Sequence, residues 1–218
     1  MTDIEKYISN INKMLELDNQ KREELITLGR SSIRCSSLAI RHLHRKEISN
    51  AENKIQENKK LISQINELAK ELNPLRFGMI LSANQEYVEA VFLYSFLQGE
   101  SFPSRDDLSV PYLAYLHGIP DFAGELRRVI LDTLRKKDSI GLAVKALDLM
   151  DELYSLLVTI DYPDGLTYNL RKKTDFTRSL LERTRGDVTL ALNRLDLVTT
   201  LDKTLKAYLP STKNDKSD

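Results

Sequence analysis

The sequence predicts an all-α fold, a single bundle of about six to seven mostly long helices, and three observations support this prediction. Apolar residues recur at helical spacing along most of the chain. Strand patterns are nearly absent, with no Asn-Gly hairpin turn and few β-branched runs. Only 8 Gly and 6 Pro interrupt the 218 residues. This length fits one helical domain over residues 1–210, followed by a polar tail over 211–218 that we expect to be disordered.

The first two helices are predicted from the spacing of isoleucine and leucine. A long helix is expected over about Asp3–Glu47, with a bend near Asp18 and Asn19. Ser49, with Glu52 three residues later, has the pattern of a capping box. We therefore expect a second helix from Ser49 to near Leu72.

The middle of the chain contains two further long helices and one short element. A helix is expected over about Pro74–Gln98, because proline disfavours helical geometry in the preceding residue and Gly99 suits a left-handed cap. The segment Ser104–Leu108 predicts a short capped turn. The next helix is expected over about Pro111–Lys137.

The last third of the chain predicts two more helices. The first is expected over Ser139–Ile160, and Asp161–Gly165 has the composition of a turn. The second begins near Leu166 and extends toward Tyr208, unless Gly186 interrupts it.

Composition limits the class of protein. The chain has 41% hydrophobic and 29% charged residues, which indicates a globular protein. No apolar run approaches the roughly 18–20 residues that cross a bilayer, and the single Cys35 cannot form an internal disulfide. We therefore predict a cytoplasmic protein with no membrane association. The 32 basic and 32 acidic residues cancel, so nucleic-acid binding requires a local basic surface.

Four carboxylates occupy positions where burial is expected. The stretch Met79–Leu97 is apolar nearly all round, which is typical of a buried helix, yet Glu86 and Glu89 lie on one face of it. In a later helix Asp121 and Glu125 are four residues apart and also share a face. An ionised carboxylate in an apolar environment is strongly unfavourable unless a cation compensates it. Both pairs therefore predict a cation between the two helices.

Two identities for that cation stay open at this point. Basic side chains would make the cluster a set of buried salt bridges, with Arg30, Arg76, Arg127 and Arg128 as candidate partners. A divalent ion would make it a metal site, because carboxylate oxygens suit Mg²⁺ or Mn²⁺ better than softer metals. Acidic pairs on helices that face each other across a bundle are an established way to build such a site.

The two acidic segments resemble motifs of the translin superfamily, with most similarity to translin-associated factor X and its archaeal relatives, the catalytic branch. The first motif is Gln85-Glu86-Tyr87-Val88-Glu89-Ala90. The second follows the pattern Tyr-Leu-x-Gly-x-x-Asp-x-x-Gly-Glu-Leu over Tyr115–Leu126. Weaker similarity extends from Lys21 to the final helix, including Leu170-Arg171-Lys172-Lys173.

This resemblance implies a seven-helix fold, closed octameric shells, single-stranded RNA binding and Mg²⁺-dependent endoribonuclease activity. It implies that Glu86, Glu89 and Asp121 are the essential acids, with Glu125 beside them as a further ligand or proton acceptor. The plain translin branch lacks the full acidic set and is a binding partner rather than the nuclease. Because this chain has all four acids, the resemblance places it in the catalytic branch.

Two residues depart from the family pattern near Asp121. His117 replaces a residue that is usually apolar, and its orientation toward the acids stays open. Pro120 removes a backbone donor and predicts a kink, which would shift Asp121. His42 and His44 lie on different sides of a helix, so we expect polar or capping roles at the end of the first helix rather than a shared metal.

A basic stripe follows the first helix. Arg30, Arg34, Arg41 and Arg45 recur at helical spacing. These side chains are interpreted either as a phosphate-contacting surface or as a solvated face with ion pairs.

The sequence therefore predicts a Mg²⁺-dependent endoribonuclease that acts on single-stranded or short RNA, and possible partners include single-stranded DNA. Two alternatives remain: a non-catalytic RNA- or DNA-binding scaffold, and an all-α nucleoside-triphosphate pyrophosphohydrolase, which also sets a Glu-x-x-Glu helix against a second acidic helix. A di-iron carboxylate bundle is disfavoured, because the sequence has no Glu-x-x-His pair.

Overall fold

The computed structural model describes residues 3–70, 78–136 and 140–208. Over these residues the protein forms eight helices and no strand, so the predicted all-α class is confirmed. Six of the helices are long, and two are single turns of four residues. Within the described segments, none of the helices combines the length and apolar character needed to cross a bilayer.

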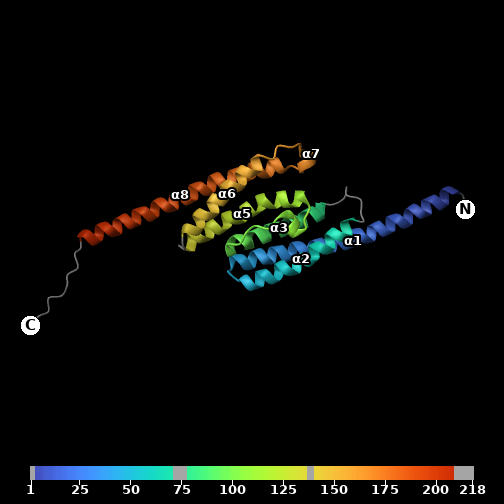
Figure 1. Ribbon diagram of the computed structural model, residues 1–218, viewed down its shortest axis with the longest axis horizontal. Coiled ribbons are helices and arrows are strands. Elements are labelled where there is room, and N and C mark those ends of the chain that lie inside the picture. The colour runs from blue at the N-terminus through green and yellow to red at the C-terminus, as the bar shows by residue number, and fades with distance from the viewer. Residues whose placement is uncertain (1–2, 71–77, 137–139, 209–218) are drawn as a thin grey trace, which may run out of the picture.

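The first layer of the bundle is a helical hairpin that packs on a central helix. Helix α1 (Asp3–His44) runs antiparallel to α2 (Ile48–Lys70), and both pack against α3 (Gly78–Gln98) (Figure 1). Asn66 of α2 and Asn84 of α3 exchange side-chain hydrogen bonds of 3.1 and 3.0 Å. This polar pair sets α3 against the hairpin, because the half-buried amide of Asn66 satisfies the buried amide of Asn84.

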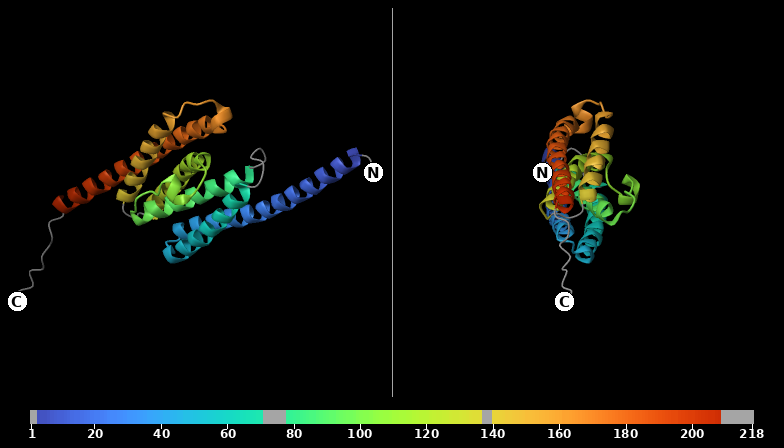
Figure 2. Two further views of the ribbon diagram at one scale, coloured as in Figure 1. Left: turned by 45° about the vertical axis from the view of Figure 1, so that its right-hand side comes forward. Right: turned by 90° about the vertical axis from the view of Figure 1, so that its left-hand side faces the viewer.

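The second layer packs on the other side of the central helices. After the single turn α4 (Arg105–Leu108), helix α5 (Tyr112–Lys136) lies against α3. Helix α6 (Ile140–Val158) and α8 (Leu170–Tyr208), with the single turn α7 (Asp164–Thr167) between them, then cover α5. Figure 2, seen end-on, shows that the long helices run roughly along one direction. The two acidic helices, α3 and α5, are therefore the centre of the bundle.

An aromatic cluster fixes how α3 meets α5. Phe92 of α3 makes edge contacts with Tyr115 and Phe122 of α5, with ring centroids 5.4 and 5.6 Å apart. Phe102, from the segment between α3 and α4, packs on both Phe92 and Phe122. Such edge-to-face pairs stabilise a contact beyond the area that they bury. Because Phe122 directly follows Asp121, the cluster also sets the position of that carboxylate.

Two helix starts differ in how well the sequence predicted them. The capping box predicted at Ser49 is wrong: α2 begins at Ile48, and the amide of Ala51 already donates to the carbonyl of Glu47, at 3.1 Å. The short element at Ser104 is confirmed, and there Ser104 and Asp107 cap each other's backbone reciprocally. Ser49 fails as a cap because the tight turn after α1 places the helix start before it.

The other boundaries are close to their predictions. Helix α8 continues through Gly186 without interruption. The predicted turn over Asp161–Gly165 is shorter than expected, since Asp164 begins α7. The predicted break at Pro74 and the tail over 211–218 lie outside the described residues.

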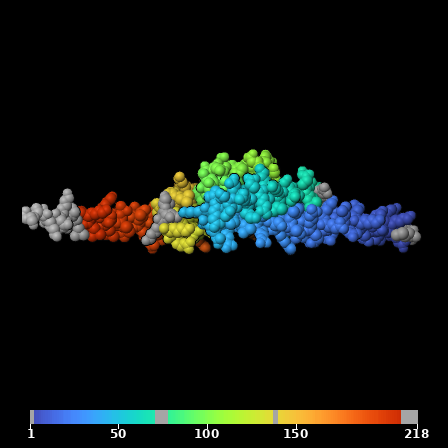
Figure 3. All heavy atoms as spheres, turned by 90° about the horizontal axis from the view of Figure 1, so that it is seen from below, coloured from blue at the N-terminus to red at the C-terminus, as the bar shows by residue number. Residues whose placement is uncertain are grey.

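Two long extensions project beyond the bundle at opposite ends (Figures 1 and 3). The N-terminal extension is residues 3–20 of α1, and the C-terminal extension is residues 193–208 of α8; nearly all of their side chains are exposed. Both carry large apolar residues, and Tyr208 is 82% exposed. Those of the N-terminal extension are Ile4, Tyr7, Ile8, Ile11, Met14, Leu15 and Leu17. Those of the C-terminal extension are Leu195, Leu197, Val198, Leu201, Leu205 and Tyr208.

Candidate active site

The four predicted acids lie at the contact between α3 and α5. Glu89 is 9% exposed, and the other three, Glu86, Asp121 and Glu125, are half-buried. The pKa of Glu89 responds to the charges of all three, which shows that the helices bring the four carboxylates together. The predicted grouping is therefore present, although their roles stay a prediction.

Glu89 is held mainly in its neutral form. Burial, and after it the negative charges of Glu86, Asp121 and Glu125, together raise the pKa of this carboxyl to about 9. Burial, with Asp121 next in importance, also raises the pKa of Glu86. Neither glutamate makes a hydrogen bond or ion pair with the described part of the chain. Across the described residues, neither carboxyl therefore has a cation in direct contact, and only the charge of Lys173, at longer range, lowers the pKa of both.

Asp121, in contrast, has direct partners from two other helices. Gln85 of α3 donates an amide hydrogen bond to its carboxylate. The ammonium of Lys173, in the first turn of α8, lies 2.9 and 2.8 Å from the two Asp121 oxygens. The same ammonium donates to the carbonyl of His117, at 3.3 Å. Asp121 is thus ion-paired, as the salt-bridge interpretation required, although by a lysine and not by a predicted arginine.

Pro120 does not interrupt α5. The helix continues through this residue, which lies in its third turn. Because proline has no amide hydrogen, the carbonyl of Leu116, four residues earlier, loses its usual intrahelical donor. The neighbouring carbonyl, that of His117, accepts from the Lys173 ammonium. Lys173 is therefore held beside Asp121 by a backbone carbonyl of α5 as well as by the carboxylate.

Glu125 is paired with the end of α1. The Nε2 atom of His44 hydrogen-bonds to its carboxylate, and Arg128 lies 3.5 Å from the same oxygen. The His44 side chain is 6% exposed, and its Nδ1 atom is 4.0 Å from Asp132. Of the two roles expected for His44, polar or capping, the structure shows a polar one, and its partner lies on α5.

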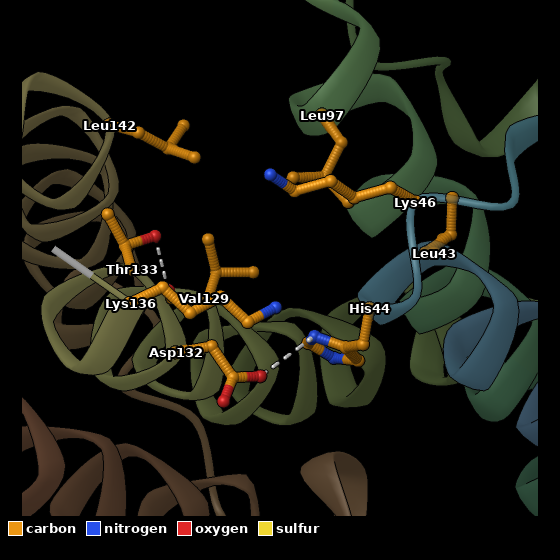
Figure 4. Close-up of a pocket in the computed structure, with 9 residues that line it drawn as sticks. All are labelled: Leu43, His44, Lys46, Leu97, Val129, Asp132, Thr133, Lys136 and Leu142. Carbon is orange, nitrogen blue, oxygen red and sulfur yellow. Dashed lines mark hydrogen bonds and ion pairs between the residues drawn. The ribbon is translucent and has the colours of Figure 1, made fainter. Parts of the chain in front are cut away.

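A small cavity is lined in part by His44 and Asp132. It has a volume of about 80 Å³ between α1, α3, α5 and the start of α6, and Figure 4 shows Asp132 and His44 at its wall. Binding sites for small organic ligands usually measure about 300–1,000 Å³. The cavity therefore suits a few water molecules and not a nucleotide.

The other predicted partners of the acids point elsewhere. Arg127 pairs with Asp187 of α8 at 3.0 Å, and Arg30 is exposed on α1. Arg76 lies outside the described residues. The ring of His117, whose orientation was left open, is buried against α7, and its Nε2 lies 2.7 Å from the carbonyl of Thr167.

The carboxylates fit a hard divalent cation by their chemistry, but not yet by their arrangement. Glu86 and Glu89 supply carboxyl oxygens that have no hydrogen-bond partner in the described structure. Burial and neighbouring negative charges raise the pKa of both carboxyls, and a dication bound between them would relieve this repulsion. Across the described residues, however, no group of three or more ligand side chains is already arranged around one point. Asp121 and Glu125 are turned toward Lys173 and His44 instead. Metal binding at this site therefore requires these pairs to rearrange.

Gly118 brings the two acidic helices close together. A Cβ atom at this position would lie 2.7 Å from Cγ1 of Val88 and 3.1 Å from the carbonyl oxygen of Gln85. The distance to Val88 is shorter than real Cβ contacts, and the distance to the Gln85 carbonyl is tighter than most of them, so a larger residue would push α5 away from α3. The first glycine of the second motif, Gly118, is therefore explained by close helix packing.

Sequence reasoning missed three residues that contact the acids: Gln85, Lys173 and His44. Gln85 and Lys173 lie in segments that resemble the family, but the three contacts join residues 36, 52 and 81 positions apart. Helical spacing relates only residues within one helix, so it could not predict these pairs.

The basic stripe of α1 lies on the solvent side of the bundle. Its members Arg30, Arg34, Arg41 and Arg45 are all exposed. None forms a salt bridge with the described part of the chain. The interpretation of this stripe as a solvated face therefore holds, but without the expected ion pairs among the described residues, and the four guanidinium groups are available to solvent.

Comparisons with known proteins agree with this architecture. A sequence model of the Translin family matches residues 11–185. An uncharacterised protein of Methanocaldococcus jannaschii is 32% identical over 182 residues, covering 81% of this chain and 78% of that protein. A structure of AfC3PO in complex with duplex RNA is 31% identical, with a TM-score of 0.79, over 87% of this chain and 98% of that one. Apo-NeC3PO is 26% identical with a TM-score of 0.77, over 84% and 96% of the two chains.

Proposed function

Because the chain belongs to the Translin family, we propose that it is a Mg²⁺-dependent endoribonuclease that cleaves single-stranded or short RNA within a homo-oligomeric shell. The observation that carries this proposal is the pair of glutamates on α3. Glu86 and Glu89 are buried or half-buried next to two other carboxylates, and they have no cationic partner of their own. Mn²⁺ is expected to replace Mg²⁺, because both prefer oxygen ligands.

Each acid has a distinct part in this proposal. Glu86 and Glu89 hold the ion from α3, and Asp121 completes the set from α5 once Lys173 leaves it. Glu125, oriented by His44, either adds a ligand or accepts a proton. The bound ion supplies charge neutralisation at the phosphodiester and activation of the attacking water.

RNA binding is supported by a relative and by this chain's own surface. AfC3PO, which shares 31% of its residues with this chain, has been solved with duplex RNA. The exposed arginines of α1 have no acidic partners in the described structure, so their charge is available to phosphates. Single-stranded DNA offers the same phosphates and is a second expected ligand.

Assembly with further copies is supported by the two extensions. Their exposed apolar residues form surfaces larger than a monomeric soluble protein usually leaves in contact with water, and such surfaces mark interaction sites. The N-terminal extension repeats Ile4, Ile8, Ile11 and Leu15 at alternating spacings of four and three residues, which is typical of helix pairing. We propose that a second copy of this chain covers them.

The test of cleavage uses labelled single-stranded RNA with the purified protein in Mg²⁺, in Mn²⁺ and in chelator. Cleavage is expected with either metal and not with chelator. Glu86→Gln and Glu89→Gln are expected to lower the rate by about 10²- to 10³-fold while RNA affinity is retained. Glu100→Gln, an identical change at an exposed glutamate, is the control and is expected to cleave normally.

One observation favours a second candidate, a scaffold that binds RNA without cutting it. Asp121 and Glu125 already have basic partners, and no metal-ligand group is arranged within the described residues. The scaffold predicts tight RNA binding with no cleavage in either metal. Cleavage at the wild-type rate by both Glu86→Gln and Glu89→Gln would contradict the proposed nuclease site.

A further inference from the structure

Lys173 stands out among the contacts of the acidic cluster, because it reaches the cluster from a third helix. Its ammonium lies 2.9 and 2.8 Å from the two oxygens of Asp121, so it bridges the whole carboxylate. The side chain is 30% exposed, and the Asp121 side chain is 28% exposed. The pair is therefore partly exposed to solvent.

The position of Lys173 in α8 is unfavourable by itself. It is the fourth residue of the helix, where the backbone dipole presents its positive end, and the first turn of α8 has no acidic residue. A cation there is destabilised unless a nearby anion offsets it. Asp121 provides that anion across the α5–α8 contact.

The charge of Lys173 also affects carboxyls other than Asp121. It lowers the pKa of Glu86 and of Glu89, against the larger effects of burial and neighbouring carboxylates. One positive charge thus partly neutralises three acids on two other helices. This is the same electrostatic task that a divalent ion would perform there.

An ammonium and a divalent ion compete for the Asp121 carboxylate. Their like charges repel, and the ammonium already contacts both of the oxygens that a metal would use. We propose that Lys173 is a built-in counter-cation that a divalent ion displaces from Asp121, and that the released ammonium then contacts the scissile phosphate. This inference rests on the proposed function, because it concerns the same site.

The lysine side chain suits such an exchange. Its flexible four-carbon stem carries a compact charge that can move between anions without movement of the helix. Gln85 still donates to Asp121 after the ammonium leaves, so the carboxylate keeps one positioning contact. A phosphate oxygen brought to the metal would give the ammonium a new anionic partner.

The test compares metal affinity and cleavage in Lys173→Met and Lys173→Gln. Mn²⁺ binding is measured from the electron paramagnetic resonance signal of the free ion, without RNA. Both variants are expected to bind Mn²⁺ about tenfold more tightly than the wild type, because a competing charge is gone. Single-turnover cleavage at saturating RNA is expected to fall about 10²-fold in both.

Lys172→Met is the matched control, because it removes the same charge from the neighbouring exposed residue of the same helix turn. It is expected to keep the wild-type Mn²⁺ affinity. Thermal unfolding of all three variants shows whether each is folded, and Lys173→Gln keeps a donor for Asp121 if the methionine variant does not fold.

A purely structural lysine gives the opposite pattern. In that case Lys173→Met binds Mn²⁺ more weakly and Lys173→Gln restores both affinity and cleavage, which overturns the inference. Unchanged affinity in both variants overturns it as well. A wild type that binds Mn²⁺ but cuts no RNA contradicts the proposed nuclease alone, and tighter Mn²⁺ binding by Lys173→Met still supports displacement.

Discussion

The protonation of Glu89 links the stability of this protein to pH. Burial raises the pKa of its carboxyl from 4.5 to about 9 in the folded protein, whereas the unfolded chain titrates near the ordinary value. The folded state therefore holds a proton that the unfolded chain releases between these two pH values. Stability from this group is present below about pH 4.5 and is lost as the pH rises toward 9.

The first prediction follows from this difference and concerns Glu89→Gln. Without metal, the free energy of unfolding of the wild type is expected to fall as the pH rises from 5 to 9. Glutamine keeps the shape and carries no charge, so Glu89→Gln should be more stable at pH 8 by about 2–4 kcal/mol. Urea unfolding in chelator at several pH values measures this. A wild type that gains stability over the same range would show that Glu89 is ionised in the fold.

At the scale of the element, the close contact of α3 and α5 depends on Gly118. We predict that Gly118→Ala destabilises the protein by about 1–3 kcal/mol, because the new methyl group overlaps Val88 and the Gln85 carbonyl. Gly124→Ala, in the same helix, is the control, since its Cβ would meet nothing within 4 Å. That control should be stabilised by about 0.5–1 kcal/mol through helix propensity. Equal effects at the two glycines, measured by urea unfolding, would contradict the packing argument.

The arginine stripe of α1 gives a second prediction at this scale. Arg34→Gln and Arg41→Gln are each expected to weaken RNA binding at low salt and to reduce the slope of log affinity against log salt by about 1. Arg183→Gln, at an exposed arginine of α8, is the control and should leave the slope unchanged. Fluorescence anisotropy with labelled RNA over a salt series measures the slopes. If both variants keep the wild-type slope, these arginines of α1 do not contact RNA phosphates.

The sequence predicted the helices better than the contacts between them. Periodicity located all six long helices and the face of α3 that carries Glu86 and Glu89, because these features depend on spacing within one helix. It did not predict that Lys173 pairs with Asp121 or that His44 crosses to Glu125. Those contacts follow from the packing of α1, α5 and α8, which local spacing does not specify.

At the scale of the whole molecule, assembly is expected to depend on the N-terminal extension. We predict that the double variant Ile8→Glu with Ile11→Glu sediments as a smaller species than the wild type, because it places charge on the apolar face. Asn10→Glu with Asn12→Glu adds the same charge at exposed polar positions and should keep the wild-type assembly. Analytical ultracentrifugation measures the mass of the wild type and of each variant, which is compared with the 25.0 kDa of one protomer. A wild type that sediments as a protomer would refute assembly through this surface.

The two extensions point away from each other (Figure 1). A protomer with one interacting end can only form a pair, whereas an open chain of protomers with two opposed ends always has two unpaired ends, one at each terminus. Growth then stops only where the last end meets the first. The number of subunits in a closed ring is therefore set by the angle between neighbouring protomers. A substitution that bends α1 between its extension and the bundle should change this number, or open the ring into fibres, without weakening any single contact.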